Sequence, residues 1–245
     1  MIYIGIDDTD TIDTAGTNQL ARRLAATLPP GFACTLVLRH QLFFDPRVPY
    51  TSKNGSASLL VRHEPGRRPE ELLPVLQAEM RAWYVPGSDP GLCVARGEVP
   101  SAITEFAHRC QREVVYQSAA RALARAHGIY LEGFGGTEDG VIGALAAVGL
   151  LAGGNDGRVV HLAGWQWPDD FSGLQPASAV LARGVQEIRA AGDGAWSERG
   201  LGEHEIIDIG KHLRPSYRDG RVVLFVEPAD ASEGGVRCWC AQKLP

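Results

Sequence analysis

The first seventeen residues of the chain place a short apolar segment directly before a cluster of acids. The segment from Ile2 to Ile6 is too short for a stable helix and is rich in β-branched side chains, which predicts a buried strand. Asp7, Asp8 and Asp10 follow at once. Carboxylates this close repel one another unless a positive group lies among them. The fold must therefore accommodate a buried strand with a highly charged end.

Two interpretations of this acidic end are open. Mg²⁺ prefers oxygen ligands and is usually held by one or two carboxylates together with phosphates and water. The strand ends of open α/β sheets are also a common place for such ligands. Asp7, Asp8 and Asp10 are then metal ligands. Alternatively, the aspartates and threonines form only a polar turn, in which side chains hydrogen-bond to the local backbone.

Composition narrows the class of protein. The 245 residues fit one large domain or two small ones. A formal net charge of −5 argues against a wholly basic nucleic-acid binder, although a local basic groove is compatible with it. No apolar run is long enough to cross a bilayer, and the N-terminus lacks the basic start of a signal peptide. The five cysteines are odd in number and scattered, which predicts reduced thiols in a cytoplasmic protein.

The first part of the chain alternates strand and helix patterns. Apolar residues at helical spacing predict a helix over 18–28, and Thr17 lies where its N-cap belongs. The remaining patterns predict strands over 32–39 and 56–62, a short apolar run over 92–95, and helices over 70–80, 102–116 and 118–127.

Two further features could bind phosphate. A glycine-rich loop over 133–143 runs into a small-residue helix over 144–151, so its backbone N–H groups could reach a phosphate at a helix start. This loop has neither the Lys-Ser/Thr ending of a Walker loop nor the spacing of the dinucleotide fingerprint. Lys53, beside Asn54-Gly55, fits either a hairpin turn with a solvated lysine or a cation placed next to an anion.

Beyond a linker at 151–157, the pattern changes to a small α+β unit. It predicts strands over 158–162, 221–227 and 235–243, a helix over 178–191, and a short apolar stretch over 205–209. A basic cluster beside Tyr217 is either a solvated turn or a phosphate- or RNA-binding feature; it comprises Lys211, His212, Arg214, Arg218 and Arg221.

Several segments together resemble one family, the archaeal tRNA(Ile2) 2-agmatinylcytidine synthetases, which use ATP to modify an anticodon cytidine with agmatine. The segments are Ile4-Gly-Ile-Asp-Asp-Thr-Asp10, Pro49-Tyr-Thr-Ser-Lys-Asn-Gly-Ser-Ala57, Asp89-Pro-Gly91, Arg112-Glu-Val-Val115 and Gly140-Val-Ile-Gly-Ala-Leu-Ala-Ala147. A weaker similarity covers 214–226. The first and last segments together are more specific than either alone.

The resemblance implies a two-domain α/β or α+β protein. Residues 1–152 are expected to form an ATP- and Mg²⁺-binding kinase-like domain, and residues 153–245 a smaller ferredoxin-like α+β domain. By alignment with the family, Asp7, Asp8 and Asp10 hold Mg²⁺ and the ATP phosphates, and Thr17 is the threonine that can accept a phosphoryl group. We expect Lys53 and the loop to bind phosphate through Gly135, Gly136, Thr137, Asp139 and Gly140.

The sequence departs from the family in three places. Lys53 stands where the family usually has arginine, and lysine cannot grip a phosphate in the same bidentate manner. Gly-Gly-Thr-Glu-Asp-Gly at 135–140 replaces the family's Gly-Asn-Gly pattern. The matched segments include neither the OB-fold nor the zinc ribbon that help the family hold tRNA. The expected partners are therefore ATP and an unidentified acceptor, with RNA or tRNA as an alternative and no membrane.

The sequence and the resemblance together lead to three candidate functions. The first is an ATP- and Mg²⁺-dependent phosphotransferase or ligase-like enzyme acting on a small molecule or RNA, with Asp7, Asp8 and Thr17 in the catalytic centre. The second is an aspartyl phosphohydrolase, because Asp8-Thr-Asp10 after a strand imitates an Asp-x-Asp nucleophile motif. Asp169-Asp170, in a tryptophan-rich loop, is poorly placed to complete such a site. The third is a nucleotide- or RNA-binding module without turnover.

Overall fold

The computed structural model of the chain describes residues 1–48, 53–166, 171–192, 195–197, 201–229 and 238–242. It contains two compact units, Met1–Gly153 and Gly154–Pro245. The assignment of these parts as kinase-like and ferredoxin-like domains stays a prediction. Two residues discussed above, Asp169 and Asp170, lie outside the described residues.

The first unit is built on an antiparallel sheet with the strand order β5-β4-β1-β3-β2. The central strand β1 is the segment predicted from the sequence, and both of its neighbours run in the opposite direction. The strands are β1 (Ile2–Asp7), β2 (Phe32–Arg39), β3 (Ala57–His63), β4 (Gly91–Arg96) and β5 (Tyr130–Gly133).

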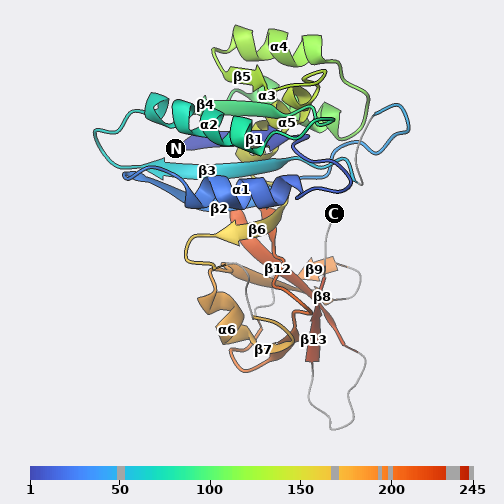
Figure 1. Cartoon of the computed structure of the whole chain (residues 1–245). Coiled ribbons are helices and arrows are strands. Elements are labelled where there is room, and N and C mark those ends of the chain that lie inside the picture. Colours follow the sequence, from blue (N-terminus) through green and yellow to red (C-terminus); the bar gives the residue numbers. More distant parts are fainter. Residues whose placement is uncertain (49–52, 167–170, 193–194, 198–200, 230–237, 243–245) are drawn as a thin grey trace. The chain divides into compact units, whose positions relative to one another are not determined.

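Helices cover both faces of this sheet (Figure 1). They are α1 (Thr17–Ala26), α2 (Leu73–Trp83), α3 (Ser101–Cys110), α4 (Gln117–Ala126) and α5 (Gly140–Gly153), with a short 3-10 helix η1 (Pro69–Leu72) before α2. On one face, α3, α4 and α5 form a buried core with Cys93 and Ala95 of β4. Because side chains alternate along a strand, Ile2, Ile4 and Ile6 point to the opposite face, where α1 packs.

Glycines allow α5 to lie directly against the sheet. A Cβ on Gly5 of β1 would collide with the carbonyl oxygen of Ala144, and one on Gly91 of β4 would collide with the backbone of Gly140. A Cβ on Gly143 would collide with the carboxyl group of Asp7. The glycines of α5 therefore serve close packing, and this packing holds the side chain of Asp7 against the first turns of the helix.

The antiparallel order determines which segments surround the acids at the end of β1. Gly91, the first residue of β4, pairs with Asp7, and Ala57, the first residue of β3, pairs with Ile6. The end of β1 therefore meets the beginnings of its two neighbours. Segments that precede β3 and β4 in the sequence can thus contribute to a site at the acidic end of β1.

Most predicted elements of the first unit are confirmed, with three local differences. Thr17 is the first residue of α1, and Gly16 is its N-cap. The helix predicted over 102–116 ends at Cys110, where the Phe43 amide donates to the Cys110 carbonyl. The β-branched Val114 and Val115 that follow disfavour helix and line a cavity instead. The strand β5 was not predicted.

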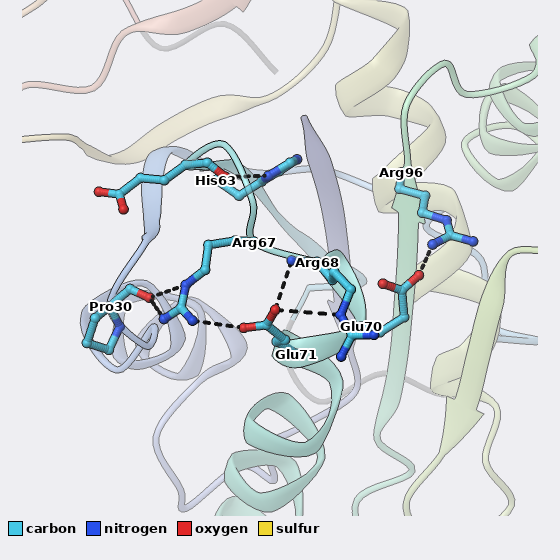
Figure 2. Close-up of polar contacts among 8 residues, drawn as sticks. Pro30, His63, Arg67, Arg68, Glu70, Glu71 and Arg96 are labelled. Atoms are coloured by element: carbon cyan, nitrogen blue, oxygen red, sulfur yellow. Dashed lines mark hydrogen bonds and ion pairs between the residues drawn. The ribbon is translucent and has the colours of Figure 1, made fainter.

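Polar contacts fix the start of η1 and α2 (Figure 2). Arg67 Nε donates to the Pro30 carbonyl oxygen over 3.1 Å, and its Nη1 pairs with Glu71 at 3.1 Å. The Glu71 carboxylate in turn accepts from the Arg68 amide at 2.9 Å, and the Glu71 amide donates to the Arg68 carbonyl at 3.0 Å. Arg96 of β4 pairs with Glu70, which ties η1 to the sheet.

The second unit is a mixed β-rich unit. Its strands are β6 (Arg158–Leu162), β7 (Leu174–Pro176), β8 (Glu187–Gly192), β9 (Ala195–Ser197), β10 (Ile206–Asp208), β11 (Ser216–Arg218), β12 (Arg221–Pro228) and β13 (Cys238–Ala241), with one helix, α6 (Ala177–Ala182), among the described residues. The strands predicted over 158–162 and 221–227 are confirmed. The helix predicted over 178–191 is wrong beyond α6, since Glu187–Gly192 pairs in parallel with β12.

Two expectations about the whole chain can be compared with the structure. The five cysteines, all within the described residues, form no disulfide, as expected for reduced thiols. Cys34, Cys93 and Cys110 are buried, and Cys238 and Cys240 are half-buried. Within the described part of the chain, no helix combines the length and apolar character needed to span a bilayer.

Candidate functional site

A cavity of about 390 Å³ opens at the acidic end of β1 in the first unit. It lies where the ends of β1 and β2, the segment before β3, the connection between α3 and α4, and the N-termini of α1 and α5 converge. Its charged and polar lining comprises Asp7, Asp8, Asp10, Thr17, Asn18, Arg39, Arg47, Lys53, Asn54, Glu113, Gln117 and Asp139. The four acids and Thr17 that the sequence singled out therefore share one cavity with Lys53.

Asp7 and Asp8 carry the strongest electrostatic perturbation in the cavity. Burial, followed by the negative charge of Asp8, raises the pKa of the Asp7 carboxyl well above its ordinary value. Burial also raises the pKa of Asp8 to about 6, and the charges of Asp89, Asp10 and Asp139 add to the shift. Asp8 further adopts a left-handed backbone conformation, with φ of 51°. The cluster is thus an arrangement that a cation would stabilise.

Asp10 and Thr17 form a hydrogen-bonded pair at the start of α1. The Thr17 hydroxyl donates to Asp10 Oδ1 over 2.8 Å, and the Thr17 amide donates to the same oxygen over 3.3 Å. The buried Thr9 hydroxyl donates to Thr17 Oγ1 over 3.1 Å. Asp10 therefore caps the helix from outside it and holds the only slightly exposed Thr17 hydroxyl in one orientation.

Cationic side chains face the acids across the cavity. Arg39, at the end of β2, has its pKa lowered by burial, and it donates from Nη2 to Gln41 Oε1 over 3.0 Å. Within the described residues Arg39 forms no ion pair. Arg47 is already paired with Asp45, with Nε and Oδ1 2.7 Å apart. Lys53 is an exposed cation of the cavity lining.

The segment around Lys53 is not a tight hairpin turn at Asn54-Gly55. The amide of Leu42 donates to the Asn54 carbonyl over 2.9 Å, and the amide of His40 donates to the Ser56 carbonyl over 2.9 Å. The Asn54 side chain donates to the Phe43 carbonyl over 2.8 Å. Residues 54–56 thus extend the β2–β3 pairing, which holds the backbone next to Lys53 against the cavity wall.

The glycine-rich loop contributes a side chain to the cavity more than it contributes amides. Asp139 lines the cavity, whereas Gly135, Gly136, Thr137 and Gly140 are not part of its lining. Three of the loop amides have partners within the protein. Glu138 N donates to the Gly135 carbonyl at 3.1 Å, and Gly140 N to the Asp89 carbonyl at 2.9 Å. The Thr137 amide donates to the Asp89 carboxylate. The phosphate-binding role expected for these residues stays a prediction.

Two groups in the site were missed by the sequence reasoning. Arg39 closes a predicted strand, and only the pairing of β2 with β3 shows that it faces the acids. Asp89 is part of Asp89-Pro-Gly91, which reads locally as a turn. The resemblance to the synthetase family includes this segment, and it was the one sequence feature that pointed to Asp89. Asp89 contacts the loop, and its backbone lies beside the Asp8 carboxylate, although Asp89 does not line the cavity.

The rest of the wall is apolar and chemically inert. It includes Leu42, Phe43, Val48, Val114, Val115 and Ile142. Cys110 also faces the cavity, but burial raises the pKa of its thiol to about 12, so it stays protonated near neutrality and is no nucleophile. The cavity therefore pairs a charged end with an apolar side that can exclude water.

The donor set fits a metal held together with a nucleotide better than a closed protein cage. No group of three or more His, Cys, Asp or Glu side chains within the described residues is arranged to hold a metal ion. Mg²⁺ does not require such a group, since it commonly takes one or two carboxylates and completes its shell with phosphates and water. The crowded carboxyls of Asp7 and Asp8 match that requirement.

The fold and the cavity define a class: an antiparallel α+β unit with an acidic, cation-rimmed cavity suited to a phosphate-bearing ligand. Sequence comparison agrees with the resemblance described above. The chain is 24% identical over 199 residues to the tRNA(Ile2) 2-agmatinylcytidine synthetase TiaS of Cenarchaeum symbiosum, covering 77% of this chain and 44% of that protein. It is 28% identical over 152 residues to TiaS of Pyrococcus horikoshii, covering 61% and 35%. The chain thus spans less than half the length of these relatives, and no family model matches it.

Solved structures show the same fold. A crystal structure of a tRNA fluorescent labeling enzyme aligns with a TM-score of 0.53 and 25% identity, covering 60% of this chain and 35% of that one. A TiaS–tRNA(Ile2)–AMPCPP–agmatine complex aligns with a TM-score of 0.53 and 20% identity, covering 74% and 43%. The chain is therefore similar in sequence and fold to part of TiaS.

Proposed function

We propose that the first unit binds ATP with Mg²⁺ in the cavity at the end of β1, and that the chain is an ATP-dependent phosphotransferase or ligase-like enzyme. The observation that carries this proposal is the convergence of Asp7, Asp8, Asp10 and Thr17 on one cavity with Arg39 and Lys53. The similarity to TiaS supports it, since TiaS has been crystallised with tRNA(Ile2), AMPCPP and agmatine. An RNA modification of that kind is the favoured reaction, and a small-molecule acceptor is the alternative.

Each group has a role that follows from its surroundings. Asp7 and Asp8 would hold Mg²⁺, which neutralises charge on a transferring phosphoryl group. Arg39 and Lys53 would contact phosphate oxygens, because they are the cavity cations without an ion pair among the described residues. The N-terminus of α1, which lines the cavity through Gly16, Thr17 and Asn18, adds favourable backbone dipoles for an anion.

Thr17 and Asp10 form the pair that could accept a phosphoryl group. Their 2.8 Å hydrogen bond is the geometry of a hydroxyl and its general base. In that step the Thr17 oxygen would bond to the γ-phosphorus, the bond from that phosphorus to the β–γ bridging oxygen would break, and the hydroxyl proton would pass to Asp10. ADP would be the leaving group.

Radiolabelled ATP tests this step directly. We expect Thr17→Ala to abolish labelling of the protein by γ-phosphate while ATP binding, measured by calorimetry with Mg²⁺, persists. The matched control is Thr27→Ala, since Thr27 lies at the other end of α1 and bonds only local carbonyls. Labelling of Thr17→Ala at the level of the unchanged protein would show that Thr17 is not the acceptor.

The two other functions give different results in the same experiments. An aspartyl phosphohydrolase would hydrolyse a phosphomonoester without ATP. In the structure Asp10, the second acid of that motif, already accepts hydrogen bonds from the Thr17 hydroxyl and amide. A binding module would take up ATP without forming a product from any RNA or amine supplied.

A further inference from the structure

Asp89 connects three parts of the site through both its side chain and its backbone. Its carboxylate accepts a hydrogen bond from the Thr137 amide, and its carbonyl oxygen accepts one from the Gly140 amide at 2.9 Å. Its backbone also lies beside the Asp8 carboxylate, since Gly91, two residues further on, pairs with Asp7 at the end of β1. One residue thus links the acidic end of β1 to the glycine-rich loop and to the first residue of α5.

The glycines of the loop are shaped around this residue. A Cβ on Gly136 would collide with Asp89 Oδ1, and a Cβ on Gly140 would collide with the Asp89 carbonyl oxygen. Gly136 also has a φ of 59°, which side-chain-bearing residues rarely adopt. These glycines therefore allow the loop backbone to approach Asp89, which accepts hydrogen bonds from the Thr137 and Gly140 amides.

A second set of contacts holds the outer side of the loop. Gln117, at the start of α4, donates to the Thr137 carbonyl at 2.9 Å and to Asp139 Oδ1 at 3.1 Å. Arg121 pairs with Glu138, which has a φ of 62°. The loop thus contacts Asp89 on one side and α4 on the other. These contacts hold the loop where the Asp139 side chain lines the cavity.

We propose that Asp89 is a positioning residue that locks the glycine-rich loop to the end of β1 and so fixes Asp8 and Asp139 relative to each other. Asp89 lies outside the cavity lining, so it acts through these two carboxylates and not by touching the ligand. The expected effect of Asp89 on ATP affinity rests on the proposed function. Its expected effect on the stability of the loop does not depend on that function.

Two variants separate the hydrogen bond from the charge. Asp89→Ala removes the acceptor of the Thr137 amide. Asp89→Asn keeps a carbonyl acceptor of the same size and removes the charge. Amide hydrogen exchange in the ligand-free protein gives a readout that does not depend on activity. The reporters are the amides of Thr137, Val141 and Ile142, since the last two donate to the Glu138 and Asp139 carbonyls at 3.2 and 3.0 Å.

In Asp89→Ala we expect exchange at all three reporters to speed up by about tenfold or more, the factor that corresponds to one lost hydrogen bond. In Asp89→Asn we expect exchange close to that of the unchanged protein. Faster exchange at Thr137 alone, or no change at any reporter, would overturn the proposal. So would an Asn variant as perturbed as the Ala variant, because charge and not the hydrogen bond would then hold the loop.

Calorimetry with Mg²⁺ and ATP extends the test to the ligand. We expect Asp89→Ala to bind about tenfold more weakly and Asp89→Asn to recover most of the affinity. Unchanged affinity in Asp89→Ala would overturn the role in the site. If the unchanged protein binds no ATP, the proposed function fails, and the exchange rates alone decide the positioning role. Gly136→Ala, which pushes the loop away from an intact Asp89, replaces Asp89→Ala if that variant does not fold, with the same expected results.

Discussion

Asp8 offers the sharpest test, because replacing it should stabilise the protein and disable it at once. Its pKa is raised from the ordinary 3.8 to about 6, by burial and by the charges of Asp89, Asp10 and Asp139. Between those two values the folded state binds more protons at this site than the unfolded state. Stability of the metal-free protein must therefore fall as pH rises through this window and level off above it.

The magnitude follows from the size of the shift. One pKa unit corresponds to about 1.4 kcal/mol, so the ionised carboxylate costs the metal-free fold about 3 kcal/mol above pH 6. Asp8→Asn removes that charge, and Asn tolerates the left-handed backbone at φ 51° better than most residues. We expect the variant to gain about 2–3 kcal/mol near pH 7.5 and almost nothing near pH 4, where Asp8 of the folded protein is already protonated.

The assay is urea unfolding in the presence of a chelator, followed by circular dichroism at the two pH values. Asp13→Asn is the matched control, since Asp13 lies in the same acidic segment but is exposed, and its stability should change by less than about 0.5 kcal/mol. Adding Mg²⁺ with ATP should raise the stability of the unchanged protein and not that of Asp8→Asn. A variant no more stable than the unchanged protein near pH 7.5 would refute the account of charge crowding at the end of β1.

Three further perturbations test other parts of the structure. Gly143→Ala should destabilise the fold by about 1–3 kcal/mol in urea unfolding, because the new methyl group overlaps the Asp7 carboxyl. The control is Gly202→Ala, where the methyl group has room. Equal stabilities of the two variants would contradict the tight packing of α5 against Asp7. Arg39→Met should weaken Mg²⁺–ATP binding about tenfold in calorimetry. The control Arg62→Met, on the exposed part of β3, should leave the affinity unchanged. Equal losses of affinity in the two variants would contradict a specific role of Arg39. Arg96→Ala breaks the exposed pair with Glu70, and the free energy of unfolding should fall by less than about 1 kcal/mol; a larger loss would show that this contact anchors η1.

The sequence was sufficient where a local pattern determined the structure. The strand predicted over Ile2 to Ile6 with the acids after it, the helix predicted over 18–28 and the strand predicted over 32–39 were found to within one or two residues, because their apolar spacing is unambiguous. The sequence was insufficient where contacts with residues distant in the sequence determine the local structure. Glu187–Gly192 continues a helical pattern after α6, yet it is a strand because β12 offers it parallel pairing. Arg39 and Asp89 could not be placed for the same reason, since only β-sheet pairing and the packing of the glycine-rich loop bring them to the acids.

The glycine-rich stretch shows how one pattern supports two physical readings. Glycines before a helix permit a phosphate to approach the backbone, and they equally permit another segment of protein to approach it. Here Gly136 and Gly140 accommodate Asp89, and Gly143 accommodates the carboxyl group of Asp7. Because this space is filled by the protein and the loop glycines do not line the cavity, we infer that phosphate recognition falls to groups that do line it: Arg39, Lys53 and the N-terminus of α1. The glycines then contribute to the site indirectly. They allow α5 and the loop to hold Asp7, Asp8 and Asp139 so close together that a cation would stabilise them.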